Sequence, residues 1–170
     1  NGTSVGQGSR VMPVATDGTA MGQGAIVAAV NGTAVGQDSR ALAVASTAYG
    51  QNAVAQGVNS TAVGEDSFAN SLSSAAFGQA AVAINTNALA VGANSVASGA
   101  NSMAVGQNAS AAGNGATAVG QNANARYNNS AAFGNNANVV GENQQMFGTT
   151  TNRYTMPGIT TASSTVHQVG

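Results

Sequence analysis

Residues 101–125 read NSMAVGQNASAAGNGATAVGQNANA and contain the phrase AVGQN twice, at 104–108 and at 118–122. The same interval continues in both directions, because a glycine that follows an apolar residue recurs along the chain. These glycines are Gly6, Gly22, Gly36, Gly50, Gly64, Gly78, Gly92, Gly106, Gly120, Gly134 and Gly148. The first interval is sixteen residues and the other nine are fourteen. Self-similarity at a fixed period indicates a repeat architecture and argues against a low-complexity linker.

The chemistry within one repeat unit predicts two strands and two turns. With the recurrent glycine as position 1, position 4 is always small, position 6 is nearly always Ala, and position 13 is Ala from Ala20 through Ala132. Positions 1 to 3 and 8 to 10 collect Gly, Asn and Asp, which tolerate a positive φ and close tight turns. Apolar residues alternate locally and do not recur every three and four residues, which excludes an amphipathic helix.

A coil of two strands and two turns, repeated every fourteen residues, predicts a β-solenoid of the flattened, roll-like kind. Each strand pairs in parallel and in register with its counterpart one coil along, so each coil adds about 4.8 Å and ten steps give a rod of roughly 50 Å. Alternation directs positions 4, 6, 11 and 13 into the coil, where Ala and Ser suit two sheets that lie unusually close. Positions 12 and 14 then point outward from the second strand.

Position 14 carries the bulky residues of the repeat. They are Val5, Met21, Val35, Tyr49, Val63, Phe77, Val91, Val105, Val119, Phe133 and Phe147. An outward row of this length exceeds the apolar patch of an ordinary soluble monomer, so it predicts parallel association of identical rods around one axis, with these residues at the core. The alternative is a wider, monomeric solenoid in which position 14 points inward and the small rows point out.

Two stretches resemble a known family. ALAVGANSVASGANSMAVGQNASAAGNGATAVGQNANA at 88–125 and STAVGEDSFANS at 60–71 are similar to the YadA-like head repeats of trimeric autotransporter adhesins of Gram-negative bacteria. The resemblance covers residues 1–148, about eleven units. It implies an all-β fold, a left-handed parallel β-roll of 14-residue coils, assembled as a homotrimer and exposed at the bacterial surface. The threefold order and the left hand come from the resemblance alone.

The two ends depart from the pattern. VMPVATD bulges between Gly6 and Gly22, and Met146 replaces the usual Ala at position 13 of the last unit. After Gly148 the period stops, and residues 149–170 contain a Pro157-Gly158 turn signal. We expect this segment to be a cap or a connector toward a neck or stalk, with a frayed linker as the alternative.

Composition excludes several functional classes. Charged residues are 5% of the chain, its net charge is −1, and neither Lys nor Cys is present. We therefore expect no nucleic-acid partner, no disulfide and no thiolate metal site. His167 stands alone, and the acids Asp17, Asp38, Glu65, Asp66 and Glu142 recur at no common position. We expect no catalytic site, no metal and no cofactor. No apolar run is long enough to span a membrane, so any anchor would lie outside these residues.

The sequence therefore predicts a non-enzymatic adhesive head at the cell surface, anchored in the outer membrane through another part of the protein. Its partners would be host extracellular matrix, a cell-surface component or an abiotic surface. The outward positions 5 and 7 vary most and form the expected binding face, which includes Arg40, Val54, Phe68, Val82, Ile84, Asn124 and Arg126.

Two alternatives remain. A passive spacer would only project another binding domain. An ice-binding solenoid would use the Thr residues at position 12, which are Thr19, Thr33, Thr47, Thr61 and Thr117. That row is interrupted by Ala75, Leu89, Met103 and Ala131.

Overall fold

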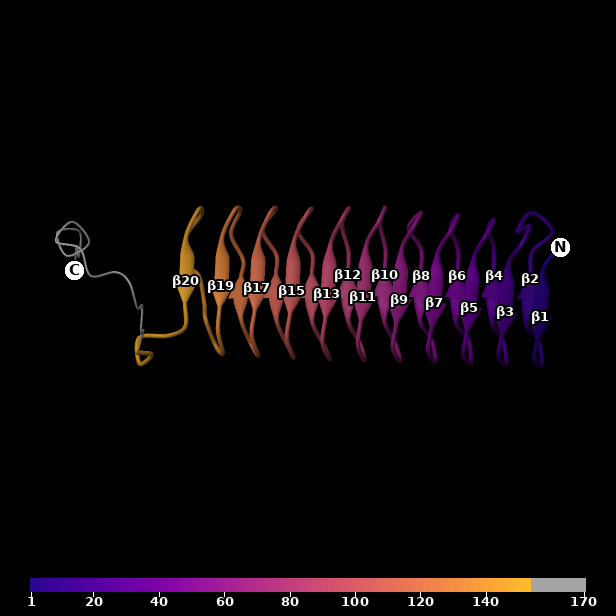
Figure 1. The fold of residues 1–170 in the computed structure, drawn as a ribbon, viewed down its shortest axis with the longest axis horizontal. Coiled ribbons are helices and arrows are strands. Elements are labelled where there is room, and N and C mark those ends of the chain that lie inside the picture. Colours follow the sequence, from indigo (N-terminus) through magenta and orange to yellow (C-terminus); the bar gives the residue numbers. More distant parts are fainter. Residues whose placement is uncertain (154–170) are drawn as a thin grey trace, which may run out of the picture.

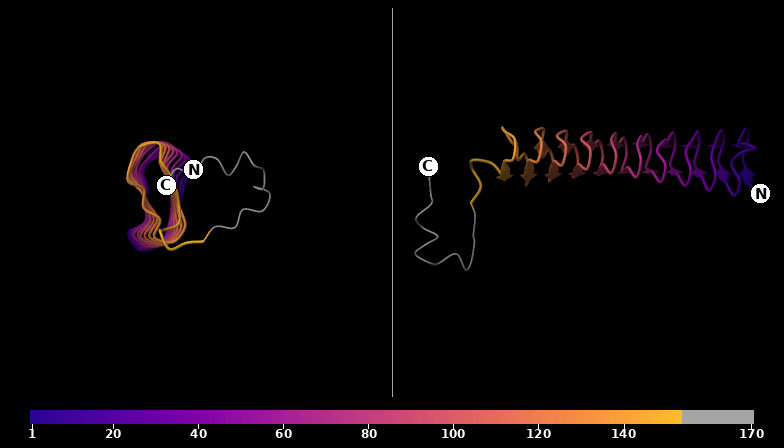
Figure 2. Two further views of the ribbon diagram at one scale, coloured as in Figure 1. Left: turned by 90° about the vertical axis from the view of Figure 1, so that its left-hand side faces the viewer. Right: turned by 90° about the horizontal axis from the view of Figure 1, so that it is seen from above.

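The computed structural model describes residues 1–153, which form one elongated stack of coils with the N-terminus at one end (Figure 1). The protein is an all-β parallel β-solenoid, and the coils superimpose when viewed along the rod (Figure 2). Two parallel sheets run the length of the rod, one of eleven strands and one of nine.

The eleven-stranded sheet is built from three-residue strands at positions 12 to 14. Its strands are β1 (Thr3–Val5), β3 (Thr19–Met21), β5 (Thr33–Val35), β7 (Thr47–Tyr49), β9 (Thr61–Val63), β11 (Ala75–Phe77), β13 (Leu89–Val91), β15 (Met103–Val105), β17 (Thr117–Val119), β19 (Ala131–Phe133) and β20 (Gln145–Phe147).

The nine-stranded sheet is built from two-residue strands at positions 5 and 6. Its strands are β2 (Arg10–Val11), β4 (Ile26–Val27), β6 (Arg40–Ala41), β8 (Val54–Ala55), β10 (Phe68–Ala69), β12 (Val82–Ala83), β14 (Val96–Ala97), β16 (Ser110–Ala111) and β18 (Asn124–Ala125). The predicted order of strand, turn, strand and turn is confirmed.

Register between neighbouring coils follows the repeat. Thr33 pairs with Thr47 and Val35 with Tyr49, so like positions stack on one another. In the longer first coil Thr3 pairs with Thr19, and Arg10 with Ile26. The two extra residues therefore lie in the loop between β2 and β3, and neither sheet changes its register.

Small side chains fill the core, as the inward rows predicted. The buried apolar residues are alanines at nearly every coil, with Val27 and Val139 as the exceptions near the two ends. Buried serines are accommodated because their hydroxyls donate to a carbonyl three residues earlier, as from Ser39 to Gly36 (2.9 Å) and from Ser74 to Ser71 (2.7 Å). Pairing these hydroxyls within their own turns avoids the cost of an unsatisfied buried polar group. Ser60 is an exception, because its buried hydroxyl has no hydrogen-bond partner among the described residues.

The turns depend on positive φ at three positions. Position 1 is glycine, with φ of 131° at Gly64, a conformation that L side chains rarely adopt. Positions 3 and 10 lie in the left-handed region and are mostly Asn or Asp, yet Ala45, Ser73 and Ala80 adopt it too. Composition did not predict these three. They follow from stacking, because the amide of Ala80 donates to the Glu65 carbonyl of the previous coil (2.8 Å).

The last coil of the described residues carries Met146 in place of the usual alanine at position 13. Met146 is half-buried and packs against the alanine core. Strand β20 ends at Phe147, and Thr149–Asn152 forms a short turn (Asn152 amide to Thr149 carbonyl, 3.2 Å). Pro157, Gly158 and His167 lie outside the described residues, so the connector at 149–170 stays a prediction.

Candidate functional site

The outer face of the nine-stranded sheet presents the predicted binding residues of position 5. Val54, Phe68 and Val82 come from the adjacent strands β8, β10 and β12 and are half-buried by their neighbours in the column. Strand pairing stacks them directly, with Phe68 between Val54 and Val82. The result is a continuous apolar ridge on this face. Asn124 extends the same column on β18 and is also half-buried.

The predicted residues of position 7 lie beyond the strand ends. Ile84 and Arg126 are both exposed and lie three coils apart. The Arg126 guanidinium donates to the Asn138 side-chain oxygen of the next coil (3.0 Å). The structure therefore brings Val54, Phe68, Val82 and Ile84 together, whereas Arg126 stands apart toward the C-terminal end.

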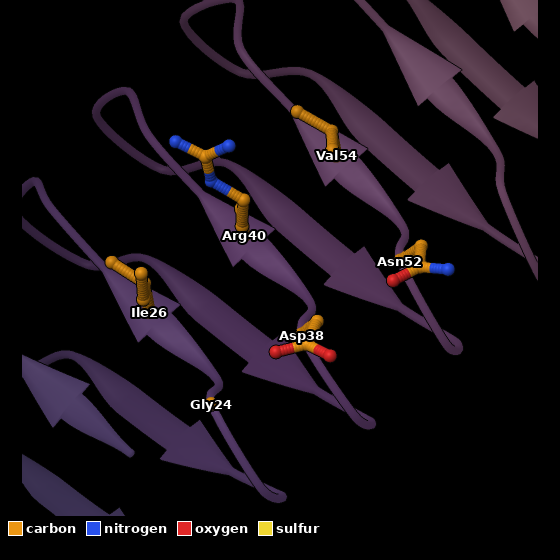
Figure 3. A pocket seen from close by; sticks show the side chains of 6 residues that line it. All are labelled: Gly24, Ile26, Asp38, Arg40, Asn52 and Val54. Atoms are coloured by element: carbon orange, nitrogen blue, oxygen red, sulfur yellow. The ribbon is translucent and has the colours of Figure 1, made fainter. Parts of the chain in front are cut away.

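A shallow hollow of about 370 Å³ surrounds Arg40 on the outer face (Figure 3). Ile26 and Val54 flank Arg40 along the column, and Gly24, Asp38 and Asn52 form the adjacent column. Gly24 deepens the hollow, because a Cβ there would collide with the Asp38 carboxylate.

The chemistry of this hollow combines the Arg40 cation with the Asp38 carboxylate, the Asn52 amide and the apolar side chains of Ile26 and Val54. Within residues 1–153, Arg40 forms no ion pair. Its guanidinium has five N–H donors in a planar fork, which suits bidentate binding of a carboxylate. Sequence reasoning selected Arg40 and Val54 but missed the hollow, which depends on the missing side chain at Gly24.

Several polar side chains at the turns hydrogen-bond to their counterparts in the next coil. Amide groups hydrogen-bond from coil to coil, for example from Asn52 to Asp66 (3.1 Å) and from Asn87 to Asn101 (3.0 Å). The ladders tie the turn of one coil to the turn of the next and so support the stack.

Position 14 lies on the outside of the eleven-stranded sheet in the isolated chain. Tyr49 is 57% exposed and Phe77 is 39% exposed. The Phe133 and Phe147 rings stack at the C-terminal end, with centroids 5.1 Å apart. The alternative solenoid with inward bulky residues is thus not the fold of this chain, whereas the role of this row as a trimer core stays a prediction.

The threonines of position 12 share the outer side of this sheet with position 14. Thr33, Thr47 and Thr61 stack in register and are half-buried. The row is a single residue wide and adjoins a bulky apolar row. It therefore lacks the breadth of a flat hydroxyl array.

Ionisable side chains do not assemble into a reactive centre in the described part of the chain. No group of three or more His, Cys, Asp or Glu that could hold a metal occurs among residues 1–153. Glu65 accepts a hydrogen bond from the Gln79 amide (3.4 Å), and neighbouring Asp66 accepts one from Asn52. Over the same residues, no helix has the length and apolarity required to cross a bilayer.

An apolar row at position 9 escaped the sequence reasoning. Val44, Val58 and Leu72 lie in successive turns and are all exposed. The sequence shows large apolar residues at this one repeat position. The row was missed because position 9 lies in a turn, where only the Gly and Asn residues were considered.

Comparison with known proteins identifies the family of this repeat. The family model of the YadA head domain repeat matches residues 15–39, 28–55, 41–67, 48–81, 97–123 and 111–137. Together these matches span 15–81 and 97–137, more than half of the chain. Comparison with curated proteins gives no match.

Among solved structures, the chain is similar to the crystal structure of the collagen-binding domain of the Yersinia adhesin YadA. The TM-score is 0.72 with 28% sequence identity, and the match covers 78% of this chain and 74% of that one. The chain therefore belongs to the YadA head domain repeat family and is a YadA-like head of the trimeric autotransporter adhesins.

Proposed function

We propose that this chain is a non-enzymatic adhesive head that works as a homotrimer at the bacterial surface and attaches the cell to extracellular matrix, other cells or abiotic surfaces. The observation that carries the proposal is the division of its apolar residues between two outer faces. The core holds almost only alanine and serine, whereas bulky residues lie on the outside of both sheets. One of these faces is available for other copies of the chain and the other for a ligand.

Family membership supports the adhesive role. The similar domain from Yersinia is described as collagen-binding, so collagen is one matrix protein to test here. The ridge of Val54, Phe68 and Val82, with Ile84 beside it, is the surface we assign to contact. The Arg40 hollow would add a site for a carboxylate group.

The assembly predicts a sedimentation mass near three times the chain mass of 16.3 kDa. Val105→Asp should dissociate it, because three carboxylates would be placed in an apolar interface without partners, at a cost of roughly 3–5 kcal/mol. We expect the dissociation constant to rise at least about a hundredfold. Ser110→Asp is the control, because it introduces the same charge on the nine-stranded sheet, away from position 14. A wild-type chain that stays monomeric would contradict the trimer.

The adhesive role predicts that the isolated head binds at least one coated surface. Binding should be measured on collagen, on cultured epithelial cells and on bare polystyrene. The double variant Phe68→Asn with Val82→Asn should reduce binding at least about tenfold, because each apolar side chain lost from a contact costs roughly 1.5–3 kcal/mol when fully buried. Asn already occupies position 5 at Asn124 and Asn138, so the coils should tolerate it.

Ser110→Asn is the matched control for this experiment, because it alters the same column without removing apolar surface. Equal binding by the double variant and the wild type would show that the ridge is not the contact surface. A trimer that binds none of the three surfaces would instead identify the head as a spacer.

A further inference from the structure

Two of the four arginines of the chain lie on the outer face of the nine-stranded sheet, near the N-terminal end of the rod. Arg10 begins β2 and Arg40 begins β6, both at position 5 of the repeat. Ile26 of β4 pairs with each of them and so stands between them. We call Arg10, Ile26 and Arg40 the arginine column. Its two cations are two strand spacings apart, about 10 Å between their Cα atoms.

Both guanidinium groups of the column are open to a ligand. Arg10 and Arg40 are exposed, and neither forms an ion pair with another group of residues 1–153. Arg126 differs, because its guanidinium already donates to the Asn138 side chain (3.0 Å). A planar guanidinium binds a carboxylate through two parallel hydrogen bonds. The column therefore suits a ligand that carries two carboxylates about two strand spacings apart.

Two glycines leave space beside this column. Position 3 adjoins position 5 on the outer face, and it is Gly8 and Gly24 in the first two coils, before Asp38 takes it in the third. A Cβ at Gly24 would collide with the Asp38 carboxylate, whereas Gly8 faces mostly open space. No side chain therefore stands at position 3 beside Arg10 or Ile26, so ligand atoms can lie there.

The hollow around Arg40 adds a hydrogen-bond acceptor and apolar walls to this surface. The exposed Asp38 carboxylate lies in the column beside Arg40, while Ile26 and Val54 flank the arginine along its own column (Figure 3). An ionised carboxylate only accepts hydrogen bonds, so it suits a hydroxyl donor. A ligand that fits therefore combines a carboxylate for Arg40, hydroxyl groups for Asp38 and C–H groups for the apolar walls. A sugar ring that carries a carboxylate has all three.

We infer that the arginine column and the hollow bind a linear acidic polysaccharide with a carboxylate on every second sugar, aligned with the long axis of the rod. Each six-membered sugar ring in an extended chain advances by about one strand spacing, so alternate sugars meet Arg10 and Arg40. The sugar between them lies over Ile26, and a hydroxyl group donates to Asp38. The inference rests on the proposed function, because it assigns a ligand class to the adhesive face of the head.

Binding at this surface depends on salt. Both arginines are exposed, and the Debye length falls to about 8 Å at an ionic strength of about 0.15 M, so the attraction between guanidinium and carboxylate is screened. We expect the affinity for the polysaccharide to fall as sodium chloride rises from about 20 to about 300 mM. Contact through the apolar ridge of Val54, Phe68 and Val82 should change little over the same range, because burial of apolar surface does not depend on charge.

Titration calorimetry of the whole chain with two matched oligosaccharides tests the inference. The probe is a hyaluronan tetrasaccharide, which carries a glucuronate at every second sugar and no sulfate. The neutral control is a chitin tetrasaccharide, which has the same number of rings and no carboxylate. We expect the hyaluronan probe to bind at least about tenfold more tightly than the chitin probe at low salt, because only the first can pair with the arginines.

Three variants locate the site on the chain. Arg10→Gln with Arg40→Gln should lower the affinity for the hyaluronan probe at least about tenfold, because both charged pairs are lost. Arg126→Gln removes the same charge elsewhere and should leave the affinity within about twofold of the wild type. Gly24→Asn fills the space beside the column without a change in charge and should lower the affinity at least about fivefold. Asn52 already adopts a positive φ at the same repeat position, so the coil should tolerate this change.

Three results would overturn the inference, provided that circular dichroism shows the variants to be folded. One is equal affinity for the two tetrasaccharides, and another is an equal loss in Arg126→Gln and in the double variant. The third is equally tight binding of a peptide with Glu at every third residue, which would mean that the column recognises carboxylates on any carrier. Adhesion to collagen, cells or polystyrene without binding of the hyaluronan probe contradicts this inference alone. Binding of the probe without adhesion to any of these surfaces contradicts the proposed function and leaves the sugar site in place.

Discussion

Gly64→Ala is expected to disrupt the coil stack. Gly64 has φ of 131°, and a Cβ added there would lie 2.5 Å from the Gly78 carbonyl oxygen of the next coil. Both the strained backbone, at about 1–3 kcal/mol, and the collision with main-chain atoms oppose the substitution. We expect a loss of at least about 3 kcal/mol, which corresponds to a fall in Tm of roughly 10 °C for a chain of this size.

The matched control for this prediction is Gly141→Ala. A Cβ at Gly141 would meet no atom within 4 Å. Its thermal unfolding, followed by circular dichroism, should match that of the wild type within about 0.5 kcal/mol, as for most surface substitutions. Equal stability of the two variants would mean that the coils can separate locally to admit a side chain.

Ala90→Leu is expected to have the second largest effect. Ala90 is fully buried in β13, and its neighbours in the sheet are Ala76 and Ala104. Overpacking an ordinary core costs about 1–3 kcal/mol. We expect at least the upper end of that range, because every residue around the site is also small and the sheets cannot separate at one coil alone.

Ala112→Leu provides the control for volume. Ala112 is exposed at position 7, where other coils already carry Leu42 and Ile84. Its unfolding temperature should stay close to that of the wild type, whereas Ala90→Leu should melt earlier or fail to fold. A stable Ala90→Leu variant would contradict the view that the spacing of the sheets selects alanine.

The inward rows were predictable because a strand alternates its side chains with a period of two, and small residues occur at every alternate position. The turns were predictable only in part. Asn, Asp and Gly mark positions 3 and 10, but Ala80 adopts a positive φ as well. Its conformation is imposed by hydrogen bonds to the coil before it, which lies fourteen residues away in sequence and one strand away in space.

The candidate surfaces were also predictable only in part from the sequence. Repeat position alone placed Phe68 and Val82 on the outer face of one sheet and the bulky position-14 row on the outer face of the other. The hollow around Arg40 needed the structure, since it depends on a missing side chain in a neighbouring coil. The exposed row of Val44, Val58 and Leu72 also needed the structure, because its residues lie in turns.

By itself, the sequence determined the length of the coil, the parallel register and the rows that face inward. It could do so because the fourteen-residue period and the alternation of a strand are properties of neighbouring residues along the chain. Only the tertiary structure decided which outward side chains stay exposed and which of them form one surface. That outcome depends on contacts between coils, which leave Leu72 exposed in a turn and Leu89 half-buried in β13.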